Sequence, residues 1–233
     1  MGKVGRGMYY HGTTKDSAEI IVNTQCVKSS IGNDHWLGDG IYFYINVEYA
    51  FRWILIKYTN NFKNEFAKDY ENIYDKYSIL SASINIRPER LFSMEDINHR
   101  LLFIETKMAL SKKAEGSKRY SEKVKNKTIV DGVVFNYLFK FEEYGKKYDA
   151  VKAVFPISYI CDDSRMEYLP EPQICVKNSE IISGYKIHSE NKVPKELVEF
   201  IDRYNRTKYE LRRKKNFNKY KNKPKSIKYQ KEV

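Results

Sequence analysis

The sequence predicts an α+β fold with a mostly antiparallel, two-sheet core and flanking helices. Three observations indicate this class: the segments that resemble strands are short, few helices stand between them as crossovers, and no internal repeat or linker marks a second globular domain. We therefore expect one folded domain over residues 1–190, followed by a C-terminal helix and tail over residues 191–233.

The N-terminal part of the chain predicts two strands, each followed by a helix. The expected strands are Met8–Tyr10 and Ile41–Tyr44, and the expected helices run over Lys15–Asn23 and from Val47 to about Tyr58. Thr14 and Asn46 have side chains that can cap these helices. The glycines of Gly38-Asp39-Gly40 predict a turn immediately before the second strand.

The rest of the chain alternates between apolar and highly charged segments. Helices are expected over residues 62–77 and 94–110, and strands over 77–86, 129–135, 150–155, 173–176 and 181–187. Residues 112–127 are charged enough to predict an exposed helix or loop. In 94–110 the helical spacing comes from Ile97, Leu101, Ile104 and Met108. A final helix is expected to begin at Val193-Pro194, with proline in its first turn.

The formal charge of +12 is concentrated at the C-terminus. Residues 203–233 carry thirteen Lys and Arg against two Glu, a net of +11, so the body is almost neutral. The basic residues include Arg212, Arg213, Lys214, Lys215 and Lys219. Aromatic residues stand among them, and cations neutralise phosphates while aromatic rings stack on unpaired bases. The tail therefore predicts contact with nucleic acid; contact with an acidic protein, such as a neutralising antitoxin, and no partner at all remain the alternatives.

Several classes of protein are excluded by composition. No apolar run approaches the roughly 18 residues of a membrane span, and the N-terminus lacks the apolar core of a signal peptide. The three cysteines, Cys26, Cys161 and Cys175, are an odd and scattered set without metal-ligand spacing. We expect a soluble cytoplasmic protein with reduced thiols and no metal site.

Two motifs and two spacings stand out. Tyr10-His11-Gly12-Thr13 ends the first expected strand, and Gly38-Asp39-Gly40-Ile41-Tyr42-Phe43 begins the second. Trp53 follows Tyr42 by eleven residues, and Glu171-Pro172-Gln173-Ile174 opens a late strand. This pattern resembles the ADP-ribosyltransferase superfamily, in the His-Tyr-Glu branch typified by diphtheria toxin and the poly(ADP-ribose) polymerases.

The resemblance implies a catalytic domain over residues 1–190 that consumes NAD as a substrate. It implies that His11 hydrogen-bonds the adenosine-side ribose and that the Gly12 backbone holds the nicotinamide carboxamide, assisted by the Thr13 hydroxyl. It also implies that Tyr42 lines the nicotinamide site and that Trp53 stacks on the ring. On the residues alone, His11 can instead be structural and the two aromatic residues can be core residues.

The late strand departs from the family pattern. The position of the family's catalytic glutamate is Gln173, and Glu171, two residues earlier, faces the same side of an extended segment. Either Gln173 orients the ribose and the acceptor supplies its own base, or Glu171 provides the carboxylate. The missing glutamate favours transfer of a single ADP-ribose over chain elongation.

The expected function is therefore mono-ADP-ribosylation of a macromolecule, with nucleic acid slightly favoured over protein as the acceptor. The small size resembles bacterial or phage-associated toxins and defence effectors. One alternative is an NAD-dependent RNA 2′-phosphotransferase, a relative in fold that lacks the Gly-Ile-Tyr-Phe element. Another is a catalytically inactive ADP-ribosyltransferase fold that binds nucleic acid.

Overall fold

A computed structural model describes residues 6–32, 35–61, 73–115, 129–140, 142–158 and 168–188. The chain divides into two compact units, one of residues 1–157 and 170–191 and the other of residues 158–169 and 192–233. The first unit holds nearly all of the described residues. The basic tail, the helix expected from Val193 and most of the helix expected over 62–77 lie outside them.

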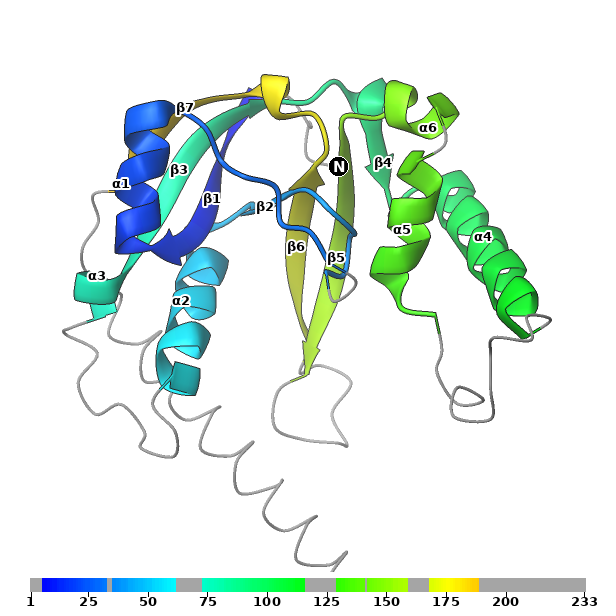
Figure 1. Cartoon of the computed structure of the whole chain (residues 1–233), viewed down its shortest axis with the longest axis horizontal. Coiled ribbons are helices and arrows are strands. Elements are labelled where there is room, and N and C mark those ends of the chain that lie inside the picture. The colour runs from blue at the N-terminus through cyan, green and yellow to red at the C-terminus, as the bar shows by residue number, and fades with distance from the viewer. Residues whose placement is uncertain are drawn as a thin grey trace, which may run out of the picture. The chain divides into compact units, whose positions relative to one another are not determined.

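Seven strands form one mixed, mostly antiparallel sheet in the order β4-β5-β6-β2-β1-β3-β7 (Figure 1). They are β1 (Arg6–Thr14), β2 (Ile41–Tyr44), β3 (Tyr77–Asn85), β4 (Leu91–Ser93), β5 (Ala150–Ser158), β6 (Tyr168–Val176) and β7 (Ile182–Ile187). The β4–β5 pair is parallel, whereas β1–β2, β1–β3, β2–β6 and β3–β7 are antiparallel. The broad α+β prediction is confirmed, but the strands form one sheet where the sequence predicted two.

Six α-helices accompany the sheet in the described part of the chain. They are α1 (Lys15–Thr24), α2 (Val47–Asn61), α3 (Ile73–Lys76), α4 (Ile97–Glu115), α5 (Asp131–Lys140) and α6 (Glu142–Lys147). The predicted cap of α1 is confirmed, because Thr14 Oγ1 accepts a hydrogen bond of 3.3 Å from the Ser17 amide. None of the helices within the described ranges is long and apolar enough to cross a membrane.

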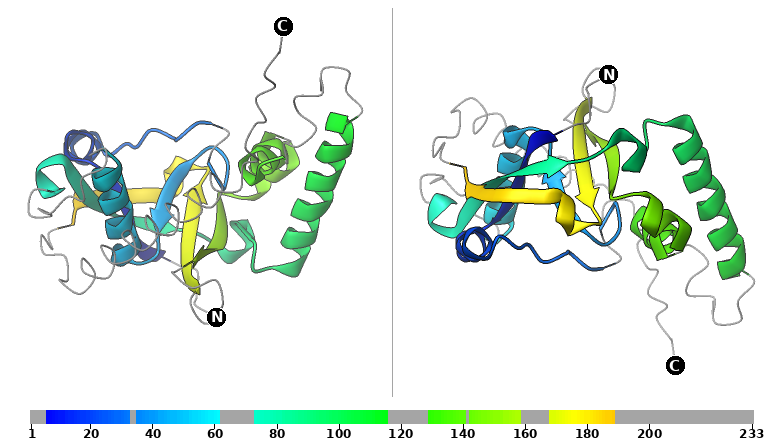
Figure 2. Two further views of the ribbon diagram at one scale, coloured as in Figure 1. Left: turned by 90° about the horizontal axis from the view of Figure 1, so that it is seen from below. Right: turned by 90° about the horizontal axis from the view of Figure 1, so that it is seen from above.

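Strand β3 is covered on both faces. Leu80, Ala82 and Ile84 belong to a core that includes Ala18 and Ile21 of α1. The alternate residues of β3 face α2, which also contacts β1 and β2. Figures 1 and 2 show α1 and α2 beside this half of the sheet. Residues of β1 therefore alternate between an α1 face and an α2 face, which decides where each motif residue lies.

A second core lies under α4 and α5, beside β4 and β5. The expected strand over 129–135 is wrong, because this segment forms the start of α5. Val134, Phe135 and Leu138 are buried, a spacing that places them on one face of a helix. A short apolar run does not distinguish a buried strand from a buried helix, and here Phe103 and Phe92 supply the surface that the helix covers.

Helix α4 forms as predicted, but its most regular apolar row is not buried. Ile97, Leu101, Ile104 and Met108 are each between 44 and 59 % exposed. Phe103, on another side of the helix, enters the second core instead, where its ring lies 4.8 Å from that of Phe135. Figure 2 shows α4 next to α5 at the outer side of the sheet.

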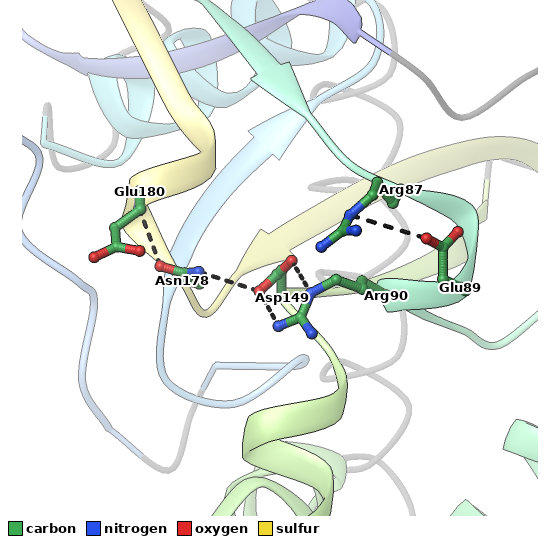
Figure 3. Close-up of polar contacts among 6 residues, drawn as sticks. All are labelled: Arg87, Glu89, Arg90, Asp149, Asn178 and Glu180. Atoms are coloured by element: carbon green, nitrogen blue, oxygen red, sulfur yellow. Dashed lines mark hydrogen bonds and ion pairs between the residues drawn. The ribbon is translucent and has the colours of Figure 1, made fainter.

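A polar network joins the ends of three strands (Figure 3). The Arg90 guanidinium donates two hydrogen bonds of 2.5 and 2.7 Å to Asp149, whose Oδ1 also accepts one of 3.1 Å from Asn178. These residues and Arg87 line an open pocket of about 540 Å³. None of the sequence motifs contributes a residue to its lining, so this pocket is separate from the predicted site.

Candidate functional site

The motif strands β1 and β2 are paired over a very short length. Within the described residues their register consists of the single pair Tyr10 and Tyr44, although β1 continues to Thr14 and β2 begins at Ile41. On its other edge β1 is paired with β3 from Arg6 through Thr14. One edge of the segment His11–Thr13 is therefore paired with β3, and its other edge faces β2, which diverges from it.

His11 spans this divergence. Its Nδ1 lies 2.8 Å from the Tyr42 carbonyl oxygen, and its ring lies 5.8 Å from that of Phe43 on the α1 face. Because a carbonyl oxygen only accepts, Nδ1 must carry the proton, and Nε2 of the neutral ring is left with a lone pair. Burial lowers the pKa of His11, which favours this neutral form.

Gly12 lies against α2. A β-carbon at this position would stand 2.9 Å from both the Ala50 carbonyl oxygen and Ile54 Cγ2, and 3.0 Å from Trp53 Cε3. Glycine is therefore required for the approach of the strand to the helix. The same approach places the half-buried indole of Trp53 beside the Gly12 backbone.

The Tyr42 side chain is fixed by the turn that precedes its strand. Its hydroxyl donates a hydrogen bond of 2.7 Å to the Gly38 carbonyl and accepts one of 2.9 Å from the Leu37 amide. Burial raises the pKa of Tyr42 far above that of a free phenol, so the hydroxyl stays protonated. The Tyr42 hydroxyl therefore both donates and accepts a hydrogen bond within the protein.

The turn itself is held by side chains from two distant elements. Asn136 of α5 accepts a hydrogen bond of 2.6 Å from the Asp39 amide, and its own amide donates one of 3.1 Å to the Asp39 carboxylate. Lys177 Nζ donates to the carbonyls of Leu37 and Asp39 at 2.7 and 2.5 Å. Gly38 has a φ of +75°, a conformation that favours glycine. The predicted turn is confirmed, and its rigidity fixes Tyr42.

On strand β6, Glu171 and Gln173 face the same side and touch. Gln173 Nε2 donates a hydrogen bond of 2.5 Å to Glu171 Oε1, and Arg52 of α2 donates to Glu171 Oε2 and forms an ion pair with it. The Glu171 side chain is 4 % exposed. Burial raises the pKa of Glu171, opposed by the charge of Arg52 and by the hydrogen bond from Gln173.

Two tyrosines that the sequence reasoning missed border this pair. Tyr44 lies opposite Gln173 in the β2–β6 ladder, and burial, together with the Glu171 charge, raises its pKa. The Tyr49 hydroxyl donates a hydrogen bond of 2.6 Å to the Pro170 carbonyl. Arg52 was also missed. Tyr44 follows Tyr42 by two residues, so strand alternation could have placed it on the same face. Nothing in the neighbouring sequence indicates Arg52.

The structure thus separates the predicted residues into two groups. Register places Gly12, Tyr42, Gln173 and Glu171 on one face of the sheet, the face that α2 and Trp53 cover. His11 and Thr13 belong to the opposite face of β1, which contributes to the α1 core. Across β2 the residue opposite Gln173 is Tyr10, two strand spacings or roughly 10 Å away, and Gly12 lies two residues further along β1, where β1 and β2 diverge.

Among the described residues, no three His, Cys, Asp or Glu side chains are grouped so that they could hold a metal ion. Cys175 is buried and Cys26 is exposed, and Cys161 lies outside the described residues.

The chain is similar to the uncharacterized protein MJ0359 of Methanocaldococcus jannaschii. The two are 35 % identical over 190 residues, which cover 74 % of this chain and 83 % of the relative. The chain belongs to the same family as that protein. No family model matches the sequence, and no solved structure matches it.

Proposed function

We propose that this protein is an NAD-consuming mono-ADP-ribosyltransferase related to the His-Tyr-Glu branch. The observation that supports this most strongly is the position of Gly12, Trp53, Tyr42 and Gln173 on one face of the sheet. These residues come from motifs spread over most of the chain. A free strand edge beside an indole suits a flat carboxamide ring, since backbone groups can bind the amide while the ring stacks.

The reaction needs few chemical groups from the protein. The bond between nicotinamide nitrogen and ribose C1′ breaks, and its electron pair leaves with nicotinamide. The acceptor then forms a bond to C1′ and loses its proton. Because the ribose carries positive charge as the bond breaks, the site must orient the leaving ring and stabilise that charge. Trp53 and Tyr42 can hold the ring, and Gln173 with Glu171 can bind the ribose.

Transfer of a single ADP-ribose unit is the form of the reaction that these residues favour. Gln173 brings no charge, and the negative charge of Glu171 is paired with Arg52. A site without a free carboxylate is poorly suited to activate a ribose hydroxyl as the next acceptor.

The acceptor proposed here is nucleic acid, on the strength of the basic tail in the sequence. Removal of residues 212–233 should reduce modification of RNA or DNA steeply at moderate salt, because phosphate contacts are screened by ions. Undiminished modification without these residues would remove the argument for nucleic acid, and protein would become the favoured acceptor.

Binding of NAD can be tested with the two tryptophans of the chain, Trp36 and Trp53. In a Trp36→Phe variant the remaining indole fluorescence reports on Trp53 alone, and NAD should quench it in a saturable manner. In the matched Trp53→Phe variant the remaining signal comes from Trp36, which is 56 % exposed and lies against Phe155, and it should not respond.

Catalysis can be tested by incubating the protein with NAD labelled in its adenylate part and with RNA, DNA and protein in turn. Transfer of label, lost in Trp53→Leu and retained in Trp36→Leu, is the expected result. Transfer of the phosphate of a 2′-phosphorylated RNA to the ADP-ribose part of NAD, with release of nicotinamide, would favour the phosphotransferase alternative. NAD left intact with every acceptor would favour the other alternative, a catalytically inactive fold that binds nucleic acid.

A further inference from the structure

The orientation of the Gln173 side chain is decided by its neighbour. An ionised carboxylate can only accept hydrogen bonds, so the group that Gln173 turns toward Glu171 must be its NH₂ group. The Arg52 guanidinium at the other carboxylate oxygen favours this ionised form. Since the amide is planar, its carbonyl oxygen then points away from Glu171.

That carbonyl oxygen has no partner in the described part of the chain. It accepts no hydrogen bond from any described residue. It is also not sealed from solvent. Gln173 as a whole is buried, with 8 % of its surface exposed. The oxygen of this nearly buried amide therefore reaches solvent, where it can accept a hydrogen bond from water or from a hydroxyl group of a ligand.

We infer that Arg52 and Glu171 are positioning residues that hold Gln173 as an acceptor for a hydroxyl group of the ligand. The inference rests on the proposed function, which makes this hydroxyl one of the nicotinamide ribose. Glu171 fixes the direction of the amide, and the ion pair with Arg52 of helix α2 holds Glu171 in place. The site then selects a ligand that can donate at this point over one that lacks the hydroxyl.

The first experiment needs no ligand. In the full chain labelled with ¹⁵N-glutamine, the side-chain NH₂ signal of Gln173 is assigned by its loss in Gln173→Met. We expect one proton of this group to be shifted downfield and to exchange slowly, as in a charge-assisted hydrogen bond. The shift should disappear in the Arg52→Met, Glu171→Gln double variant and persist in Arg87→Gln, a control at an exposed arginine.

The second experiment measures NAD turnover in the same variants. The double variant is used because it removes both charges and leaves no uncompensated buried ion. Its turnover should fall about tenfold, the effect of one hydrogen bond. In the Gln173→Met background the same two substitutions should cause no further loss, because the acceptor that they position is already absent.

Two results would overturn the inference. One is an unshifted, rapidly exchanging Gln173 amide in the unsubstituted chain. The other is an equal loss of turnover from Arg52→Met, Glu171→Gln in the presence and absence of Gln173, which would assign the pair a general structural role. If NAD is neither bound nor consumed, the proposed function fails, and the NMR result alone then decides how Gln173 is held.

Discussion

Gly12 of β1 lies so close to Ala50 of α2 that a β-carbon at position 12 would stand 2.9 Å from the Ala50 carbonyl oxygen. This contact fixes the distance between the strand and the helix that carries both Trp53 and Arg52. The glycine that the family resemblance assigns to a ligand is therefore also a structural requirement, and these two roles can be separated by experiment.

Gly12→Ala should destabilise the fold by about 1–3 kcal/mol, because the obstructing atoms include backbone that cannot rotate away. The free energy of unfolding in urea measures the effect. Thr13→Ala, one residue along the strand and half-buried, is the matched control and should have a smaller effect. A Gly12→Ala protein as stable as the parent would mean that α2 can shift without cost.

The stability of the fold should depend on pH through His11. Burial lowers its pKa from 6.5, so the folded state resists protonation more than the unfolded state does. This contribution is complete above pH 6.5 and is lost as the pH falls toward the lower, folded pKa. We expect the difference in Tm between pH 7.5 and pH 5.5 to be smaller in His11→Asn, and an unchanged difference would contradict the assignment.

A second acid-sensitive element is the network of Figure 3. The hydrogen bonds from Arg90 hold the pKa of Asp149 below 3.8, so its contribution to stability is present above that value and is lost as the pH falls further. Asp149→Asn should lower the Tm at pH 7 and flatten its decline in acid. Glu89→Gln is the control, because its ion pair with Arg87 is long and exposed.

The two sides of α4 should respond very differently to substitution. Phe103 lies in the second core and is 7 % exposed, so Phe103→Ala should cost about 3 kcal/mol or more. Leu101 is 49 % exposed, and Leu101→Gln should stay within about 0.5 kcal/mol. Chemical denaturation of the two variants measures the contrast. A large loss from Leu101→Gln would show that the exposed row is covered in solution.

Local signals in the sequence predicted the first half of the fold well. The Gly38-Asp39-Gly40 turn and the Thr14 cap are each defined by residues a few positions apart, and both are present. The segment over 129–135 failed because its apolar run is equally compatible with a strand and a helix, and packing against Phe103 decided the outcome. Strand β4 has three residues, too few to produce a pattern.

The candidate site was predictable only where a motif is continuous in the sequence. The two predicted residues of the late strand, Glu171 and Gln173, do lie side by side. Arg52 could not be predicted, because its partner is 119 residues away and an arginine on a helix surface carries no distinguishing local signal. The faces of β1 were also hidden, since His11 and Gly12 are adjacent in sequence yet point to opposite sides of the sheet.

The segment around Glu171 has one more property, which follows from its flanking residues. Pro170 and Pro172 each fix one backbone angle by ring closure, and a residue that precedes proline is confined to extended geometry. The backbone at Glu171 is therefore biased toward the shape of a strand by covalent structure before any partner is met. Less backbone entropy is then lost on folding of this segment, so more of the free energy of the contacts with Arg52 and Gln173 is left to order the Glu171 side chain.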